Sequence, residues 1–201
     1  MLNYIIIIVA GYLLGSINMG VLVSKIGFLD DVRGHGSGNA GATNMARVFG
    51  MGAGFITLLG DMLKAVIAML IGKWLMGDLG LAIGGVACIV GHCLPVFFHF
   101  KGGKGVAVAV AVALMTHFYC LLAFGVVFFA LALTTKKVSV GSVCAAIALP
   151  ITAAILSVST PKLLLCIAAM LTVLWQHRPN IRRIFNNTEP DFKPAHRNKK
   201  L

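Results

Sequence analysis

Three short polar clusters interrupt an otherwise apolar chain of 201 residues. The first reads GSGNAGATNMAR. Closely spaced glycines, among them Gly36 and Gly38, let backbone amides turn toward one point, and such concave nests bind anions. Arg47 adds a planar, permanently charged fork that suits phosphate. Neutral donors come from four side chains: Ser37, Asn39, Thr43 and Asn44. The cluster therefore predicts a phosphate-binding loop, with a flexible interhelical turn as the alternative.

The glycines of this loop also satisfy G-x-G-x-x-G, the pattern of a dinucleotide site. That site requires a strand before the glycines and an acidic residue about 20 positions beyond them. Here a membrane helix precedes the glycines, and Asp61, at the acidic position, lies inside an apolar run. The context therefore argues against a dinucleotide cofactor.

The second cluster, FKGGKGVA, is not a nucleotide-binding P-loop, because Gly105 follows Lys104 where that motif has Ser or Thr. Gly102 and Gly103 free the backbone at the start of a helix, where the helix dipole favours anions. Lys104 places a compact positive charge beside them. We predict a second phosphate contact, although Lys101 and Lys104 could instead be plain anchors at the membrane surface.

The third cluster, HRPNIRR, closes the last apolar run. His177 and Asn180 are spaced i, i+3 and share a helical face if the turn continues past the proline. His177 could then orient a hydroxyl or donate to a phosphate, and a plain basic cap is the alternative. Ser142, one turn from Ser139, could donate to an anion at the same face, although such serines more often cap or pack helices.

The composition is that of an integral membrane protein. Hydrophobic residues make up 59% of the chain and charged residues 11%, whereas a soluble protein is about a quarter charged. A membrane-spanning helix needs roughly 20 apolar residues, so about seven passes use most of the length. We predict an all-α protein with a polytopic membrane domain over residues 1–185 and a basic cytoplasmic tail over residues 186–201.

Apolar runs place the expected helices. They cover residues 2–26, 51–72, 79–98, 105–116, 118–133, 138–157 and 162–176. With seven passes, 14 of the 17 basic residues gather on one side, and only Lys64, Lys73 and Lys162 lie elsewhere. Lys and Arg collect in cytoplasmic loops, so the net charge of +11 reflects topology rather than nucleic-acid binding. We expect the amino terminus outside, the carboxyl terminus in the cytoplasm and all three clusters at the cytoplasmic face.

Asp61 and Lys64 are the only opposite charges within one span. Each costs roughly 2.5–3.5 kcal/mol at mid-membrane, so the two should pair or face the bundle interior. We interpret them as helix-positioning residues, with a direct substrate role as the alternative. The five cysteines lie in apolar runs without a Cys-x-x-Cys pair, so no metal site is expected.

In these motifs the chain resembles the bacterial acyl-phosphate-dependent glycerol-3-phosphate acyltransferases. GSGNAGATNMAR resembles their first motif, GHCLPVFFHFKGGKGVA their second and HRPNIRRI their third. Departures are small: Ala40 stands where proline is common, and Ile184 where leucine is common. The resemblance implies transfer of a fatty acyl group from acyl phosphate to the 1-hydroxyl of glycerol 3-phosphate. The products are 1-acyl-glycerol 3-phosphate and phosphate, the first step of phospholipid synthesis in the cell (inner) membrane.

Acyl transfer usually needs a base. None of the six acidic residues lies in the three motifs, and the His-x4-Asp pattern of CoA-dependent acyltransferases is absent. Either His177 takes the hydroxyl proton, or a substrate phosphate oxygen takes it while the enzyme positions charges. We favour the second route. On that hypothesis the phosphates are held by Lys104, Arg47 and Ser37. His177 and Asn180 would align glycerol 3-phosphate.

The expected partners are acyl phosphate, glycerol 3-phosphate and the lipid bilayer, with no nucleic acid, cofactor or metal. We take a monomer as the working expectation. The main rival is a small transporter for an organic phosphate. Transporters tend to place their polar sites near the midplane and often have internal repeats, whereas the polar clusters here gather at one face.

Overall fold

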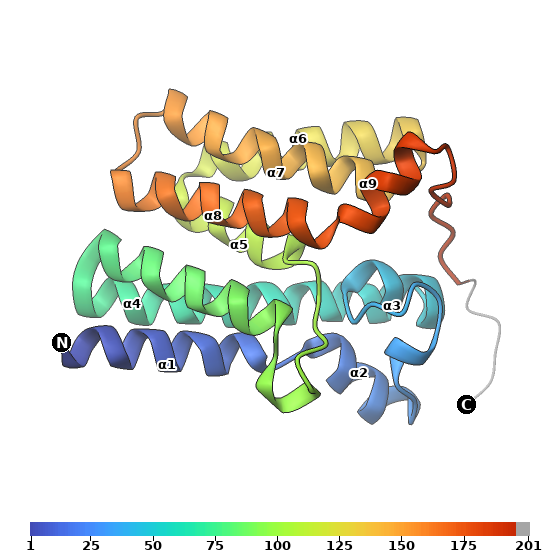
Figure 1. Cartoon of the computed structure of the whole chain (residues 1–201), viewed down its shortest axis with the longest axis horizontal. Coiled ribbons are helices and arrows are strands. Elements are labelled where there is room, and N and C mark those ends of the chain that lie inside the picture. The colour runs from blue at the N-terminus through green and yellow to red at the C-terminus, as the bar shows by residue number, and fades with distance from the viewer. Residues whose placement is uncertain (196–201) are drawn as a thin grey trace.

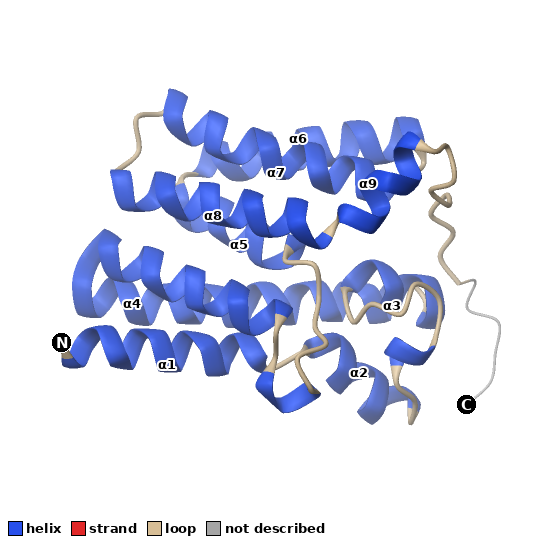
Figure 2. Ribbon diagram, in the orientation of Figure 1, coloured by secondary structure: helices blue, strands red, loops and turns tan. Residues whose placement is uncertain are grey.

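The computed structural model describes residues 1–195, and all regular structure in this range is helical (Figures 1 and 2). In chain order the elements are α1 Leu2–Ser16, α2 Met19–Phe28, η1 Val32–Gly34, α3 Ala42–Phe49, α4 Met51–Cys93, η2 Val96–Phe98, α5 Val106–Thr116, α6 Phe118–Thr135, α7 Val138–Ile155, α8 Thr160–Gln176 and α9 Arg178–Phe185. The prediction of an all-α protein is confirmed. The last part of the predicted tail, residues 196–201, lies outside the described range.

The first predicted helix, over 2–26, is two helices. Ile17 is extended (φ −69°, ψ 102°) and ends α1. Asn18 begins α2, because its side-chain oxygen accepts a hydrogen bond from the amide of Val21 at 3.1 Å. The prediction of one continuous helix was wrong because the apolar pattern runs through the break, where Asn18 is the polar signal.

Asp61 and Lys64 lie at this break. The Lys64 ammonium donates to the carbonyls of Gly15 at 2.9 Å and Ile17 at 2.5 Å, which lie at the carboxyl end of α1. An Asp61 oxygen lies 2.8 Å from the Lys64 nitrogen and accepts from the amide of Met19, at the start of α2, at 3.5 Å. The pair therefore satisfies backbone groups that the break leaves without helical partners.

Helix α4 contains a reversal. Met76 (φ −147°, ψ 23°) and Gly77 (φ 60°, ψ −144°) leave the helical conformation, and Figure 1 shows two arms side by side. Gly72 and Gly80 face each other near the turn, and neither has room for a Cβ because the other's carbonyl group occupies the space. The two arms correspond to the second and third predicted helices.

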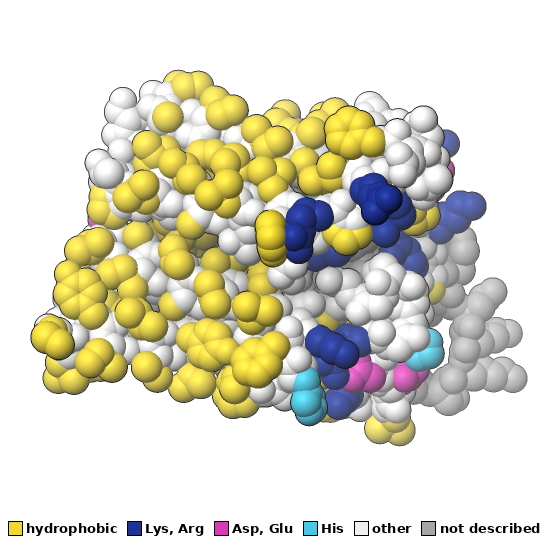
Figure 3. Space-filling model, in the orientation of Figure 1, with side chains coloured by type: hydrophobic (Ala, Val, Ile, Leu, Met, Phe, Trp, Pro, Cys, Tyr) yellow, Lys and Arg dark blue, Asp and Glu magenta, His cyan; other side chains and the backbone are white. Residues whose placement is uncertain are grey.

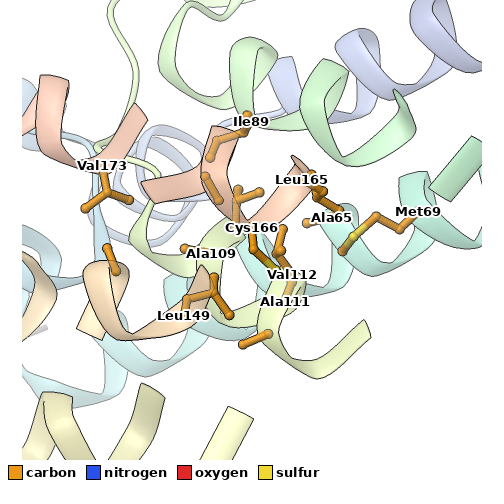
Figure 4. Close-up of a cluster of buried hydrophobic side chains, with 14 of the residues drawn as sticks. Ala65, Met69, Ile89, Ala109, Ala111, Val112, Leu149, Leu165, Cys166 and Val173 are labelled. Carbon is orange, nitrogen blue, oxygen red and sulfur yellow. The ribbon is translucent and has the colours of Figure 1, made fainter. Parts of the chain in front are cut away.

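The apolar core lies where α4, α5, α7 and α8 meet (Figure 4). Val112, Leu149, Leu165 and Cys166 are buried there, and many of their neighbours are alanines, which let helices approach closely. Helix α5 has 11 residues, too few to cross a bilayer alone. It is tolerated because other helices enclose it.

The outer surface is suited to lipid. Four segments of the described residues are long and apolar enough to cross a membrane: Leu2–Phe28, Met51–Phe98, Phe118–Thr135 and Val138–Ile155. In Figure 3 hydrophobic side chains cover most of the visible face, and Lys and Arg gather toward the end that carries α2, α3 and α9. The polar clusters lie at that end.

Candidate active site

A cavity of about 200 Å³ brings the three polar clusters together. Of the residues predicted from the sequence, nine line it: Ser37, Asn39, Thr43, Asn44, Arg47, Lys104, Ser142, His177 and Asn180. The other four predicted residues are glycines that do not line it: Gly36, Gly38, Gly102 and Gly103. Segments far apart in the sequence therefore line one cavity.

Asn44 organises the first loop from within. Its amide nitrogen donates to three loop carbonyls, those of Val32 (3.2 Å), His35 (3.0 Å) and Asn39 (2.9 Å). Its oxygen accepts from the amide of Ser37 at 2.9 Å. Asn44 is buried, and these bonds occupy its polar groups. Asn44, which the motif predicts as a substrate contact, supports the loop through these bonds and also lines the cavity.

The loop needs two left-handed glycines, Gly36 (φ 58°) and Gly38 (φ 70°), to close around Asn44. A Cβ on Gly36 would collide with the Asn44 oxygen. These glycines shape the turn, and α3 follows it directly. Arg47, on α3, lines the cavity and has no hydrogen-bond or ion-pair partner among residues 1–195. Its guanidinium therefore remains available to an anion.

The glycines of the second loop are required by packing. Gly103 donates its amide to the carbonyl of His92 at 3.0 Å. A Cβ on Gly103 would strike the His92 ring, and one on Gly102 would strike the His92 carbonyl. Gly105 is left-handed (φ 84°) and starts α5. The second loop thus packs closely against His92, and this packing places Lys104 at the cavity.

A chain of hydrogen bonds joins the second and third clusters. The Lys104 ammonium donates to the side-chain oxygen of Asn180 at 2.5 Å, and the Asn180 nitrogen donates to Glu189 at 2.7 Å. Glu189 also accepts from Ser139 and Arg183, each at 2.7 Å. Asn180 therefore orients Lys104. We had expected Asn180 to align glycerol 3-phosphate, and in this structure both ends of its amide already have partners.

The surroundings of Lys104 shift the pKa of its ammonium group. The pKa of Lys104 is lowered to about 8, chiefly by burial; Glu189 opposes this shift, and the cations of Arg183 and Arg47 add to it. Two cations, Lys104 and Arg47, thus face one cavity within electrostatic range of each other. A bound anion would relieve their mutual repulsion.

His177 is held in one tautomer. Its Nδ1 lies 2.8 Å from the carbonyl oxygen of Val173, which can only accept, so Nδ1 carries the hydrogen and Nε2 is an acceptor. Burial, followed by the Lys104 charge, lowers the pKa of His177 to about 4. A neutral His177 with Nε2 as an acceptor can orient a hydroxyl. It cannot donate through that atom to a phosphate, which was one of the two expected roles.

Part of the remaining cavity lining is apolar, and part is polar or charged, with Asp61, His92 and Glu189 among its residues. The apolar part comes from Leu58, Val106, Ala107 and Phe128. Ser142 donates to the carbonyl of Val138 at 2.9 Å, so its hydroxyl hydrogen is engaged within α7. An amphiphile with an anionic head and a hydrocarbon tail matches this combination of surfaces.

Comparison with known proteins agrees with this chemistry. A family model described as glycerol-3-phosphate acyltransferase matches residues 5–187. The chain belongs to this family. A glycerol-3-phosphate acyltransferase of Syntrophotalea carbinolica is 38% identical over 195 residues, covering 96% of this chain and 100% of the relative. One from Bacillus cytotoxicus is 40% identical over 189 residues, covering 94% of each chain. The resemblance read from the motifs is confirmed.

Two crystal structures of PlsY (YgiH), an integral membrane glycerol 3-phosphate acyltransferase, share the fold at 33% sequence identity. The glycerol 3-phosphate form has a TM-score of 0.89 and covers 94% of this chain and 96% of that one. The lysophosphatidic acid form has a TM-score of 0.87 and covers 94% and 95%. The helical architecture is therefore that of an integral membrane protein.

Within this family member, sequence reasoning missed Glu189. It lies two residues beyond the family match and outside the three motifs, in the segment that was expected to be a tail. Residues past α9 fold back on the bundle, where the amide of Phe192 donates to the carbonyl of Lys136 at 2.8 Å and that of Ala195 to Ala46 at 3.1 Å. The available signal was the scarcity of acidic residues in a strongly basic chain.

Proposed function

We propose that this family member transfers a fatty acyl group from acyl phosphate to the 1-hydroxyl of glycerol 3-phosphate. Two cations carry the proposal: Lys104 and Arg47 line a cavity that apolar side chains such as Leu58 and Phe128 also line. Both substrates bring a phosphate, and the donor also brings a hydrocarbon chain. The relatives named for glycerol 3-phosphate acylation support the acceptor, and the motif resemblance supports the acyl-phosphate donor.

Arg47 suits the phosphate that must be held in a fixed orientation, because its planar fork can make two parallel hydrogen bonds. Lys104, oriented by Asn180, supplies a point charge beside it. One such donor at the developing oxyanion is worth roughly 2.7–4 kcal/mol. The hydrocarbon chain lies against Leu58 and Phe128 and continues toward the bilayer.

The reaction balances without a protein base. The 1-hydroxyl oxygen attacks the acyl carbonyl carbon, the bond between that carbon and the phosphate oxygen breaks, and inorganic phosphate leaves. A phosphate oxygen takes the hydroxyl proton. His177, with its pKa lowered to about 4, is a weak base at neutral pH, so its Nε2 holds the hydroxyl by accepting a hydrogen bond and fixes the direction of attack.

The membrane arrangement follows from the helices. We propose seven passes among the described residues: α1 with α2 as one, the two arms of α4 as two, and α5 to α8 as four. An odd number of passes places the termini on opposite sides. By the positive-inside bias, the amino terminus lies outside, and the cavity and carboxyl terminus lie at the cytoplasmic face of the cell (inner) membrane.

The deciding experiment incubates the purified protein, in lipid nanodiscs, with acyl phosphate and labelled glycerol 3-phosphate. Labelled lysophosphatidate and inorganic phosphate should form in equal amounts, and acyl-CoA in place of acyl phosphate should give none. Product formed with acyl-CoA alone would refute the proposed donor. Uptake of unmodified glycerol 3-phosphate into proteoliposomes, with no lipid product, would establish the transporter instead.

A further inference from the structure

Arg33 lies outside the cavity and ties the two glycine loops together. Its Nε donates to one oxygen of Asp31 at 3.0 Å and its Nη2 to the other at 2.7 Å. The remaining nitrogen, Nη1, crosses to the second loop, where it donates to the carbonyls of Phe98 at 3.0 Å and Lys101 at 3.5 Å. The guanidinium is therefore fixed to the first loop by Asp31 and is hydrogen-bonded to the backbone of the second loop.

The second loop has few other external anchors. Within residues 1–195, Arg33 is the only side chain that donates to a carbonyl between residues 96 and 103. His99 (φ 58°) and Phe100 (φ 57°) are both left-handed without being glycine. Such conformations cost roughly 1–3 kcal/mol each and persist only where the surroundings impose them. Lys104 lies four residues beyond Phe100.

We propose that Arg33, held by Asp31, is a positioning residue that fixes the second loop, and with it Lys104, at its distance from Arg47. The role of that spacing in acyl transfer rests on the proposed function; the mechanical coupling of the loops does not. Arg33 itself touches neither the cavity nor a reacting atom.

Only arginine can make this link. Asp31 takes two of the guanidinium nitrogens in a bidentate pair, which fixes the plane of the third. The ring of Phe98 lies 5.9 Å from the guanidinium carbon and packs beside it. A lysine has one nitrogen on a flexible stem, so it could pair with Asp31 or reach Phe98 but could not hold both in one geometry.

The coupling is tested without any assay of activity. Hydrogen–deuterium exchange of Arg33→Gln, in nanodiscs, should accelerate about tenfold or more over residues 96–104 and stay unchanged in α7 and α8. The rate at which a small amine-reactive reagent acylates Lys104, read by mass spectrometry, should also change. Wild-type exchange and labelling in the variant would overturn the proposal, whatever the protein catalyses.

Kinetics then test the consequence for the site. Arg33→Gln and Arg33→Lys should each lower kcat/KM for glycerol 3-phosphate by about 10- to 100-fold, since a displacement of about 1 Å can cost that much. The charged groups facing Lys104 are Glu189, Arg183 and Arg47. If Lys104 becomes more hydrated, its pKa rises from about 8 toward its ordinary value, and the alkaline limb of the rate profile shifts upward. A mere loss of folded protein lowers the rate without moving that limb.

Lys25→Ala is the matched control. Lys25 also faces Asp31, at 3.8 Å, but its side chain is 54% exposed and contacts neither loop carbonyl. This variant should exchange, label and turn over like the wild type; an equal effect in it would show that charge near Asp31, and not the Arg33 link, is what counts. A wild type that makes no lysophosphatidate refutes the proposed function, while the exchange result still decides the coupling.

Discussion

The Lys104 ammonium donates a 2.5 Å hydrogen bond to Asn180, a residue 76 positions further along the chain. The second and third sequence clusters are thereby joined in a single contact. Asn180 passes the interaction on to Glu189 at 2.7 Å. The orientation of the cation therefore depends on an amide and a carboxylate that come from α9 and the segment after it.

Replacing Asn180 with Ala should lower kcat/KM by about 100-fold, because Lys104 loses its acceptor and Glu189 loses a donor. Steady-state kinetics with both substrates would measure this. Asn186→Ala, at the exposed end of the same helix, is the control and should match the wild type. Equal activity in Asn180→Ala and wild type would show that the Asn180 amide is not needed to orient Lys104 for the reaction.

Arg47→Ala should reduce kcat/KM by about 100- to 1,000-fold, since the cavity would lose its guanidinium fork. Arg47→Lys should recover only part of that loss, because an ammonium cannot bind phosphate bidentately. Arg178→Ala is the control, since that side chain lies 3.2 Å over the Trp175 ring and does not line the cavity. Full activity in Arg47→Ala would leave Lys104 as the sole phosphate ligand.

The rate should fall as the pH rises through about 8. Lys104 has its pKa lowered to about 8, so it is charged below that pH and neutral above it, and its attraction for phosphate disappears. A bound anionic substrate raises the pKa again, so the limb in kcat should lie at higher pH than the limb in kcat/KM. A flat profile from pH 7 to 9.5 would contradict the assignment of Lys104.

The group that accepts the hydroxyl proton can be identified from the acidic limb of the pH–rate profile. Because the pKa of His177 lies near 4, an acid limb between pH 5.5 and 7 should persist in His177→Ala, at a reduced rate, if it belongs to a substrate phosphate. Disappearance of that limb in the variant would make His177 the base. Substrate binding measured in parallel separates loss of orientation from loss of affinity.

Glu189→Gln should move the alkaline limb to lower pH. Glu189 raises the pKa of Lys104, so removing its charge lets burial and the neighbouring cations lower that pKa further. Asp191→Asn is the control, because Asp191 pairs with Lys137 at 3.0 Å on the surface. An unchanged limb in Glu189→Gln would show that Glu189 only holds the backbone in place.

Gly103→Ala should destabilise the protein by about 1–3 kcal/mol, as overpacking does, because the new methyl group meets the His92 ring. Thermal unfolding in detergent would show a lower Tm, together with lost activity. Gly125→Ala, in open space on α6, should be neutral or stabilise by up to about 1 kcal/mol. Equal Tm values for the two variants would mean that the loop adapts.

Most of the helices could be predicted from the sequence, because a lipid-facing helix is recognisable by its length and its apolar composition. The break at Asn18 could not, since the residues on both sides remain apolar and the partner charges lie on α4. The reversal at Gly77 was visible as an interruption between two apolar runs. Periodicity locates helices, whereas breaks inside one depend on distant partners.

The motifs that form the site could be predicted from the sequence, but the hydrogen bonds between their side chains could not. Arg47 and Lys104 are recognisable by residue type and by their glycine neighbours. Whether an amide faces substrate or supports a loop is decided by neighbours that come from other segments, as Asn44 shows. Glu189 was missed for the same reason, because its partners meet it only after the chain folds back beyond α9.

The length of α5 bears on how deep Lys104 lies. It is antiparallel to α6 and joined to it by the single residue His117, yet it has 11 residues against 18 in α6. At 1.5 Å per residue the difference in length is about 10 Å. On the proposed function, Lys104 would then lie deeper than the end of α6, and the soluble acceptor would reach it from the aqueous side. The acyl donor would arrive by lateral diffusion, with its acyl chain remaining in the bilayer.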